Sequence, residues 1–130
     1  MEKIETSRMV KFWLISGALL GVLSVALGAF GAHALKNILD EYGHTIYDKA
    51  VRYQMFHAAA ILIVGILQQI FKKNNFAPAG WAFLFGTIIF SGSLYILSVT
   101  GMKWLGAITP IGGTAFVFGW CWLGYVSSKI

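Results

Sequence analysis

Charge is scarce in this sequence. Charged side chains make up 12% of the 130 residues, and Asp and Glu together number only five. A soluble domain carries roughly 25% charged residues, so the chain lacks the charge that covers a water-exposed surface. Hydrophobic residues make up 58% of it. The surplus apolar surface therefore predicts a protein solvated by lipid.

Cysteine is almost absent. The single thiol, Cys121, excludes an intrachain disulfide and leaves the redox compartment open. Because it lies inside an apolar run, we expect it to behave as a small buried hydrophobe.

The net charge of +5 does not come from a basic patch. The lysines and arginines punctuate apolar runs, as the charges that flank membrane spans do. This pattern argues against nucleic acid as a partner and favours the lipid bilayer.

Four apolar windows predict four transmembrane helices in one domain over 1–130. After loop residues are set aside, the spans are about 12–35, 53–71, 79–99 and 104–128. A helix needs about 20 apolar residues to cross a hydrocarbon core of roughly 30 Å. The windows are continuously apolar, unlike barrel strands, which alternate over about ten residues. The predicted fold is an all-α, up-down, four-helix transmembrane bundle.

The first window admits a second interpretation. Basic residues precede it, and Ala32-His33-Ala34 near its end resembles a signal-peptide cleavage site. Signal sequences usually have apolar regions of only about 7–15 residues, so we favour an uncleaved span.

The loops carry an uneven number of Lys and Arg, which predicts the orientation. Six lie on the side of the termini: Lys3, Arg8, Lys11, Lys72, Lys73 and Lys129. Four lie on the other side: Lys36, Lys49, Arg52 and Lys103. We therefore expect a cell-membrane protein with both termini in the cytoplasm.

The connections have local signals. Thr45 and Asp48 form a T-x-x-D capping box, which predicts that the second helix begins near Thr45. Asp48 and Arg52 then share one helix face at i, i+4. Before them, apolar and charged residues are interspersed from Lys36 to Tyr42, which predicts a short interfacial helix between helices 1 and 2. Gly101 predicts a tight turn before the fourth span, and Trp13, Trp81 and Trp104 fall where an aromatic belt would lie.

Small residues recur at helical spacing in the first and fourth spans. In lipid such strips let two helix backbones approach closely. They predict packing inside the bundle or contact with a second copy or another membrane protein. The helix-packing residues that we expect are Gly17, Gly21, Gly28, Gly31, Gly112 and Gly113.

Polar side chains within the spans are few, and no Asp, Glu, Lys or Arg falls in any predicted span. Their positions predict one layer near a single membrane face, serving as a polar network or a ligand pocket. The residues of this layer are His33, Tyr53, Gln54, His57, Ser91, Ser93, Tyr95 and Thr109. Pro110 should loosen the fourth helix beside it.

These residues do not predict an enzyme. No nucleophile–histidine–acid set can be assembled in the spans, and His33 and His57 fall short of the three or four ligands of a usual zinc site. We therefore expect no catalytic residues, no metal and no cofactor. A haem clamped by these two histidines is a further alternative, which the crowded glycine contacts disfavour.

Four ordered motifs resemble one family. They are Gly28-Ala29-Phe30-Gly31-Ala32-His33-Ala34-Leu35, Tyr53-Gln54-Met55-Phe56-His57, Phe90-Ser91-Gly92-Ser93-Leu94-Tyr95, and Thr109-Pro110-Ile111-Gly112-Gly113 with Gly119-Trp120. Together they resemble the small membrane proteins of domain of unknown function 423. The resemblance implies a small multi-span membrane protein and no particular activity.

Two functions follow as hypotheses. The first is a non-enzymatic accessory or helix-packing interaction protein. The alternative is a small-solute transporter or channel that uses the His/Tyr/Ser layer. A sealed bundle would favour the first hypothesis, and a hydrated cleft reaching past mid-membrane would favour the second.

Overall fold

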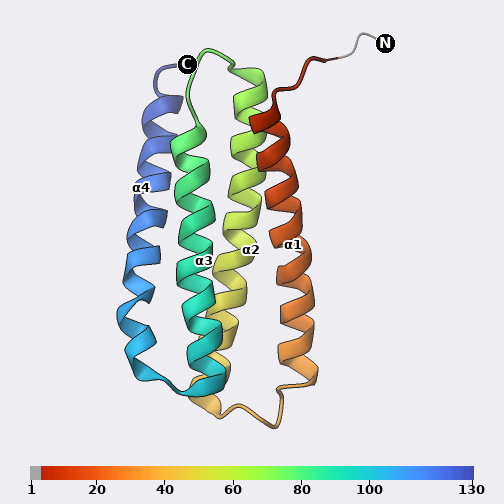
Figure 1. Cartoon of the computed structure of the whole chain (residues 1–130), viewed down its shortest axis with the longest axis vertical. Coiled ribbons are helices and arrows are strands. Elements are labelled where there is room, and N and C mark those ends of the chain that lie inside the picture. The colour runs from red at the N-terminus through yellow and green to blue at the C-terminus, as the bar shows by residue number, and fades with distance from the viewer. Residues whose placement is uncertain (1–3) are drawn as a thin grey trace.

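Four long α-helices make up most of the protein. A computed structural model describes residues 4–130, so Lys3, which was counted for orientation, lies outside the described residues. The elements are α1 (Arg8–His33), α2 (Glu41–Ile70), α3 (Ala77–Thr100), the 3₁₀-helix η1 (Lys103–Ala107) and α4 (Thr109–Ser127). The helices run alternately up and down, and both termini lie at one end (Figure 1). All four are long and apolar enough to cross a membrane, as expected.

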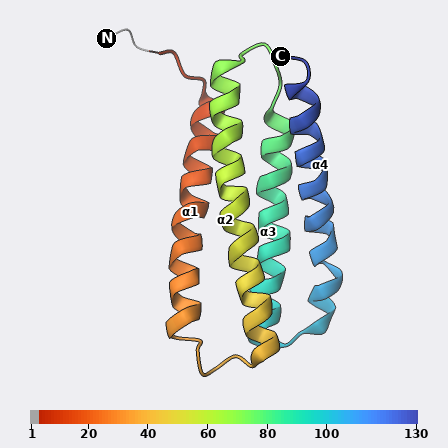
Figure 2. The same cartoon turned by 180° about the vertical axis from the view of Figure 1, so that it is seen from behind.

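The helices pack in a row, each against its neighbours in the chain. Extensive contacts join α1 to α2, α2 to α3 and α3 to α4, and within residues 4–130 no comparable contact joins α1 to α4. Both views show α1 and α4 at the outside and α2 and α3 between them (Figures 1 and 2). Accordingly, 44% and 39% of the spanning windows of α2 and α3 are buried, against 17% and 22% for α1 and α4. The up-down bundle therefore leaves its first and last helices with wide exposed faces.

The connection between α1 and α2 differs from the prediction. Residues 34–39 form turns and a bend instead of an interfacial helix. The Oδ1 atom of Asp40 accepts a 2.6 Å hydrogen bond from the amide of Gly43, which caps α2. The helix thus begins at Glu41, and the Thr45 hydroxyl donates to the Glu41 carbonyl inside it. The expected start at Thr45 was wrong because Asp40 is an earlier N-cap.

Three charged residues lie in the first half of α2. Asp48, Lys49 and Arg52 are exposed and lie within this helix, as the prediction of a helix start near Thr45 also required. They precede the predicted span 53–71, so the absence of charge from that span stays a prediction. Within residues 4–130, Asp48 and Arg52 also form no ion pair within 4.0 Å, although they share a face.

The fourth span begins in two pieces. Gly101 has φ of 70° and is the only described residue with positive φ, so the predicted tight turn is present. The 3₁₀-helix η1 follows, and α4 begins only at Thr109, with Pro110 in its first turn. Because proline has no backbone N–H, it suits a helix start better than an interior. The continuous helix expected from residue 104 is therefore broken near Ile108, which is where Pro110 was expected to loosen it.

Glycines set the distance between neighbouring helices. A Cβ atom on Gly17 would lie 2.8 Å from a Leu62 side-chain carbon, one on Gly28 would lie 3.4 Å from Val51, and one on Gly31 would meet the Tyr47 ring. Gly112 packs against Phe90 of α3 in the same way. Gly21, by contrast, has nothing within 4 Å, and Gly113 has only the Phe90 ring at 3.9 Å. Two of the six expected glycines thus make no close packing contact within the chain.

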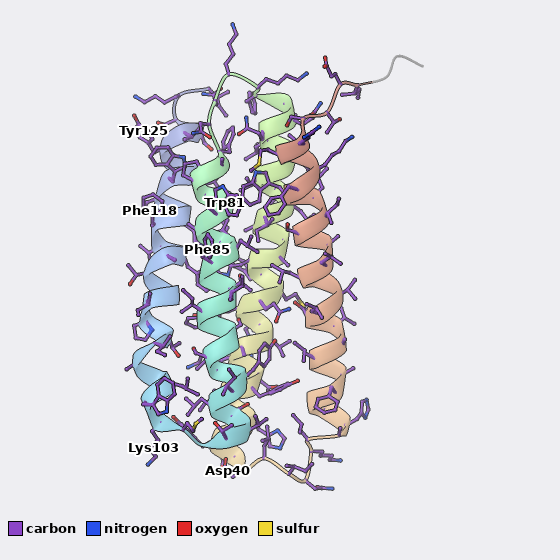
Figure 3. The ribbon with its side chains drawn as sticks, viewed as in Figure 1. Asp40, Trp81, Phe85, Lys103, Phe118 and Tyr125 are labelled. Atoms are coloured by element: carbon purple, nitrogen blue, oxygen red, sulfur yellow. The ribbon has the colours of Figure 1, made fainter. Side chains whose placement is uncertain are left out.

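Trp13 and Cys121 also depart from expectation. Trp13 is fully buried against the backbone of Gly80 and the edge of Trp81, so it belongs to the core and not to an aromatic belt. Trp81 and Trp104 are exposed, as is Cys121 on α4. Trp81 lies on the outer surface with Phe85, Phe118 and Tyr125, while Asp40 and Lys103 lie at the opposite end (Figure 3).

Candidate functional site

Gln54 joins three helices inside the bundle. Its side chain is 3% exposed, its Nε2 donates 3.0 Å to the carbonyl of Leu20 on α1, and its Oε1 accepts 2.7 Å from the Tyr95 hydroxyl on α3. The Tyr95 ring also contacts Tyr47, whose hydroxyl donates 2.5 Å to the carbonyl of Leu27. These bonds tie α1, α2 and α3 together at places where lipid supplies no hydrogen-bond partner.

His57 connects α2 with α4. The Trp120 indole Nε1 donates 3.0 Å to His57 Nε2, which makes Nε2 the acceptor of the ring. Nδ1 then donates 2.8 Å to the carbonyl of Tyr53. The imidazole stacks on Phe116 with ring centroids 3.6 Å apart and planes at 6°. With both nitrogens in use, this histidine is held as a neutral structural link.

The serines make two further links. Ser91 donates 2.7 Å to the carbonyl of Ala50, from α3 to α2. Ser93 and Thr109 share a 2.7 Å hydrogen bond that ties the beginning of α4 to α3. Trp13 Nε1 is the only buried side-chain nitrogen or oxygen without a hydrogen-bond partner in the part of the chain that the structure describes. The other buried polar side chains thus find their hydrogen-bond partners within the protein, either in other side chains or in backbone carbonyls.

The residues of the predicted polar layer can be placed along the helices. Gln54 and His57 lie about 20 and 24 Å along α2, a helix about 45 Å long at a rise of about 1.5 Å per residue. Both are near the middle of α2, because this helix begins before the predicted span 53–71. The position of the layer near one membrane face stays a prediction. Ser93 and Thr109 remain toward the end where η1 lies.

The side chains of His33 and Tyr53 are not part of these buried links, although the Tyr53 carbonyl accepts from His57. His33 is exposed at the end of α1, beside an opening that Lys36, His44 and Asp48 also line. His57 lines a different opening and has both ring nitrogens hydrogen-bonded, so the two histidines do not face one site as a haem clamp requires. Among the described residues, no group of three His, Cys, Asp or Glu side chains is placed to hold a metal ion. Tyr53 is 40% exposed, and its ring lies 4.5 Å from that of Phe90 between centroids, with the planes tilted by 32°.

Residues 27–113 match the family described as "Protein of unknown function (DUF423)". Relatives extend the match to most of the chain. A UPF0382 membrane protein of Staphylococcus haemolyticus is 45% identical over 114 residues, which is 88% of this chain and 93% of the relative. The UPF0382 membrane protein YwdK of Bacillus subtilis is 42% identical over 112 residues, covering 85% and 91%. This chain belongs to the DUF423 family.

The DUF423 match has consequences for the site. The family region contains every residue of the predicted polar layer, together with Gly112 and Gly113. The relatives are called membrane proteins, in agreement with four helices able to span a membrane, so the chain is a multi-pass membrane protein. No solved structure matches it.

Two partners within this DUF423 chain were missed as members of the site. Tyr47 lies before the predicted start of its span, and Trp120 had been noted only as part of a motif. A tryptophan in mid-span needs an acceptor for its indole N–H, and that requirement was the one available signal for Trp120. Tyr47 had none, because it precedes the predicted span 53–71, although the helix predicted to begin near Thr45 includes it.

Proposed function

We propose that the protein is a non-enzymatic accessory protein that works through lateral contact in the membrane, in the first place with its own copies. The observation that carries this proposal is the exposed face of α1. The helix lies at the outside of the row, and only 17% of its spanning window is buried. Small residues on this face let a second helix approach closely in lipid.

The small residues that remain uncovered are at helical spacing. Ala18 and Ala29 are exposed, and Gly21 between them has nothing within 4 Å. Gly17, Gly28 and Gly31 already contact α2, so the helix has one occupied strip and one free strip. The free strip supports contact with a second copy of the chain.

The alternative of a transporter or channel has less support. It needs the polar side chains to face a hydrated path, whereas Gln54, His57 and Ser91 are buried and bonded to neighbouring helices. Polar groups that satisfy one another offer few sites to a passing solute.

Self-association can be tested with a cysteine on the free strip. In a Cys121→Ser background, we expect Ala18→Cys to form a disulfide-linked dimer on oxidation in liposomes at low protein density. Adding Gly21→Leu should lower the dimer fraction about tenfold, since about 1.4 kcal/mol corresponds to a tenfold change. The matched control is Ile88→Cys on α3, which is 57% exposed. Equal cross-linking of the two cysteines would contradict a specific contact through α1.

We also propose that both termini face the cytoplasm of the cell. The start of α1, the end of α4 and the connection between α2 and α3 lie at one end of the bundle (Figure 2). Lys72 and Lys73 belong to that connection. In the sequence, six Lys and Arg belong to the end of the termini and four to the opposite end, and this difference supports the proposal.

Orientation is testable by labelling. In the Cys121→Ser background, we expect Asn74→Cys to resist a membrane-impermeant maleimide in intact cells and to react after permeabilisation. Lys36→Cys, at the opposite end, should react in intact cells. The reverse pattern would place the termini outside.

A further inference from the structure

Arg52 is a cation placed among apolar helices. It lies about 16 Å along α2 from Glu41, at about 1.5 Å per residue. The neighbouring Ala50 is level with Ser91, and α3 continues from there for about 14 Å to Thr100. An arginine at such depth is costly unless its guanidinium finds water, a headgroup or an anion. Within residues 4–130, no carboxylate comes within 4.0 Å of it.

A groove lies beside this cation. It has a volume of about 560 Å³ and is lined by residues of α2 and α4, with Phe90 of α3 between them. This size is within the range of about 300–1,000 Å³ found for ligand pockets. The groove faces the lipid, because Phe56 is 60% exposed and Val117 is 63% exposed.

The groove offers one charge and otherwise apolar faces. Its histidine, His57, uses one nitrogen for Trp120 and the other for the Tyr53 carbonyl. Gly113 also lines the groove, and a Cβ there would meet nothing nearer than the Phe90 ring at 3.9 Å. The missing side chain at Gly113 helps to leave space between α2 and α4. The fitting occupant therefore has one anionic group and a long apolar part.

We propose that this groove binds an anionic glycerophospholipid. The Arg52 guanidinium donates hydrogen bonds to the lipid phosphate, and one acyl chain lies along the aromatic side chains between α2 and α4. Arg52 is exposed on the surface of α2 that faces lipid, and arginine binds phosphate in a two-pronged geometry that supplies a counter-charge there. The groove is lined by α2, α3 and α4, whereas the free strip belongs to α1 at one end of the row. Lipid binding in the groove therefore does not depend on self-association.

The test is lipid binding by the whole protein. Protein in detergent is titrated with phosphatidylglycerol or phosphatidylcholine of the same acyl chains, and bound lipid is counted by native mass spectrometry. We expect phosphatidylglycerol to bind about tenfold more tightly than phosphatidylcholine, and Arg52→Gln to remove that preference. Lys49→Gln is the matched control, since Lys49 is an exposed cation of the same helix that does not line the groove. It should retain the preference.

The apolar part of the site is tested separately. Gly113→Leu should fill the groove and weaken both lipids about tenfold, while Gly92→Leu, on an open part of α3 outside the groove, should not. Should Gly113→Leu fail to fold, Val117→Trp fills the same groove from an exposed position. The proposal is overturned if Arg52→Gln and Lys49→Gln weaken phosphatidylglycerol equally, or if filling the groove leaves lipid binding unchanged. Binding of fatty acid but not of phospholipid would replace the proposed occupant.

Discussion

Replacing Gly112 by alanine is expected to lower the free energy of unfolding by about 1–3 kcal/mol, the usual cost of overpacking. The new Cβ would lie 2.5 Å from the backbone nitrogen of Phe90 and 2.9 Å from the carbonyl oxygen of Gly86. Backbone atoms cannot turn aside as a flexible side chain can, so α3 and α4 must separate. The measurement is unfolding in dodecyl maltoside micelles with rising dodecyl sulfate, followed by circular dichroism.

Gly113→Ala is the matched control for Gly112→Ala. Both changes raise the intrinsic helix preference by up to about 1 kcal/mol, so the comparison isolates crowding. A Cβ at Gly113 would have only the Phe90 ring, at 3.9 Å. We expect this variant to be as stable as the original protein or slightly more stable. Equal loss of stability in the two variants would show that helix approach at Gly112 is not the cause.

Replacing Gln54 by leucine should have a similarly large effect, about 2–3 kcal/mol of destabilisation. The change removes the bond to Leu20 on α1 and leaves the Tyr95 hydroxyl without its acceptor. An unpaired buried polar group costs about 1–3 kcal/mol, whereas a hydrogen bond between transmembrane helices averages only about 0.6 kcal/mol. The unpaired hydroxyl is thus the larger contribution.

A double-mutant cycle separates these two contributions. Adding Tyr95→Phe to Gln54→Leu removes the orphaned hydroxyl, so we expect the double variant to be more stable than Gln54→Leu alone by about 1 kcal/mol. Gln69→Leu serves as the control, because Gln69 bonds only to the Glu5 carbonyl at the exposed end of the bundle. Strictly additive losses at Gln54 and Tyr95 would contradict the coupling.

The polar interior and the outer surface suggest different roles. Gln54, His57 and Ser91 are hydrogen-bonded to neighbouring helices, and both proposals therefore concern the outward features of the protein. Those features are the free strip of α1 and the groove beside Arg52. Both proposals place the activity at the boundary with lipid or with another chain.

Local signals explain which connections could be predicted. Gly101 takes the left-handed conformation that its place in a tight turn requires. The start of α2 was ambiguous in the sequence, since Asp40 and Thr45 are both residue types that cap helix N-termini well. The choice of Asp40 depended on the geometry of the preceding turns.

The sequence by itself determined that this is a membrane protein with four helices. Uncharged windows long enough to cross hydrocarbon have no other stable solvent, and lipid forces each to satisfy its own backbone hydrogen bonds. Only the tertiary structure decided that Gly112 packs while Gly113 does not, that Trp120 meets His57, and that Arg52 borders a groove. Those facts depend on the rotation and register of each helix against its neighbours. Rotation and register are fixed by packing between side chains that are distant in the sequence.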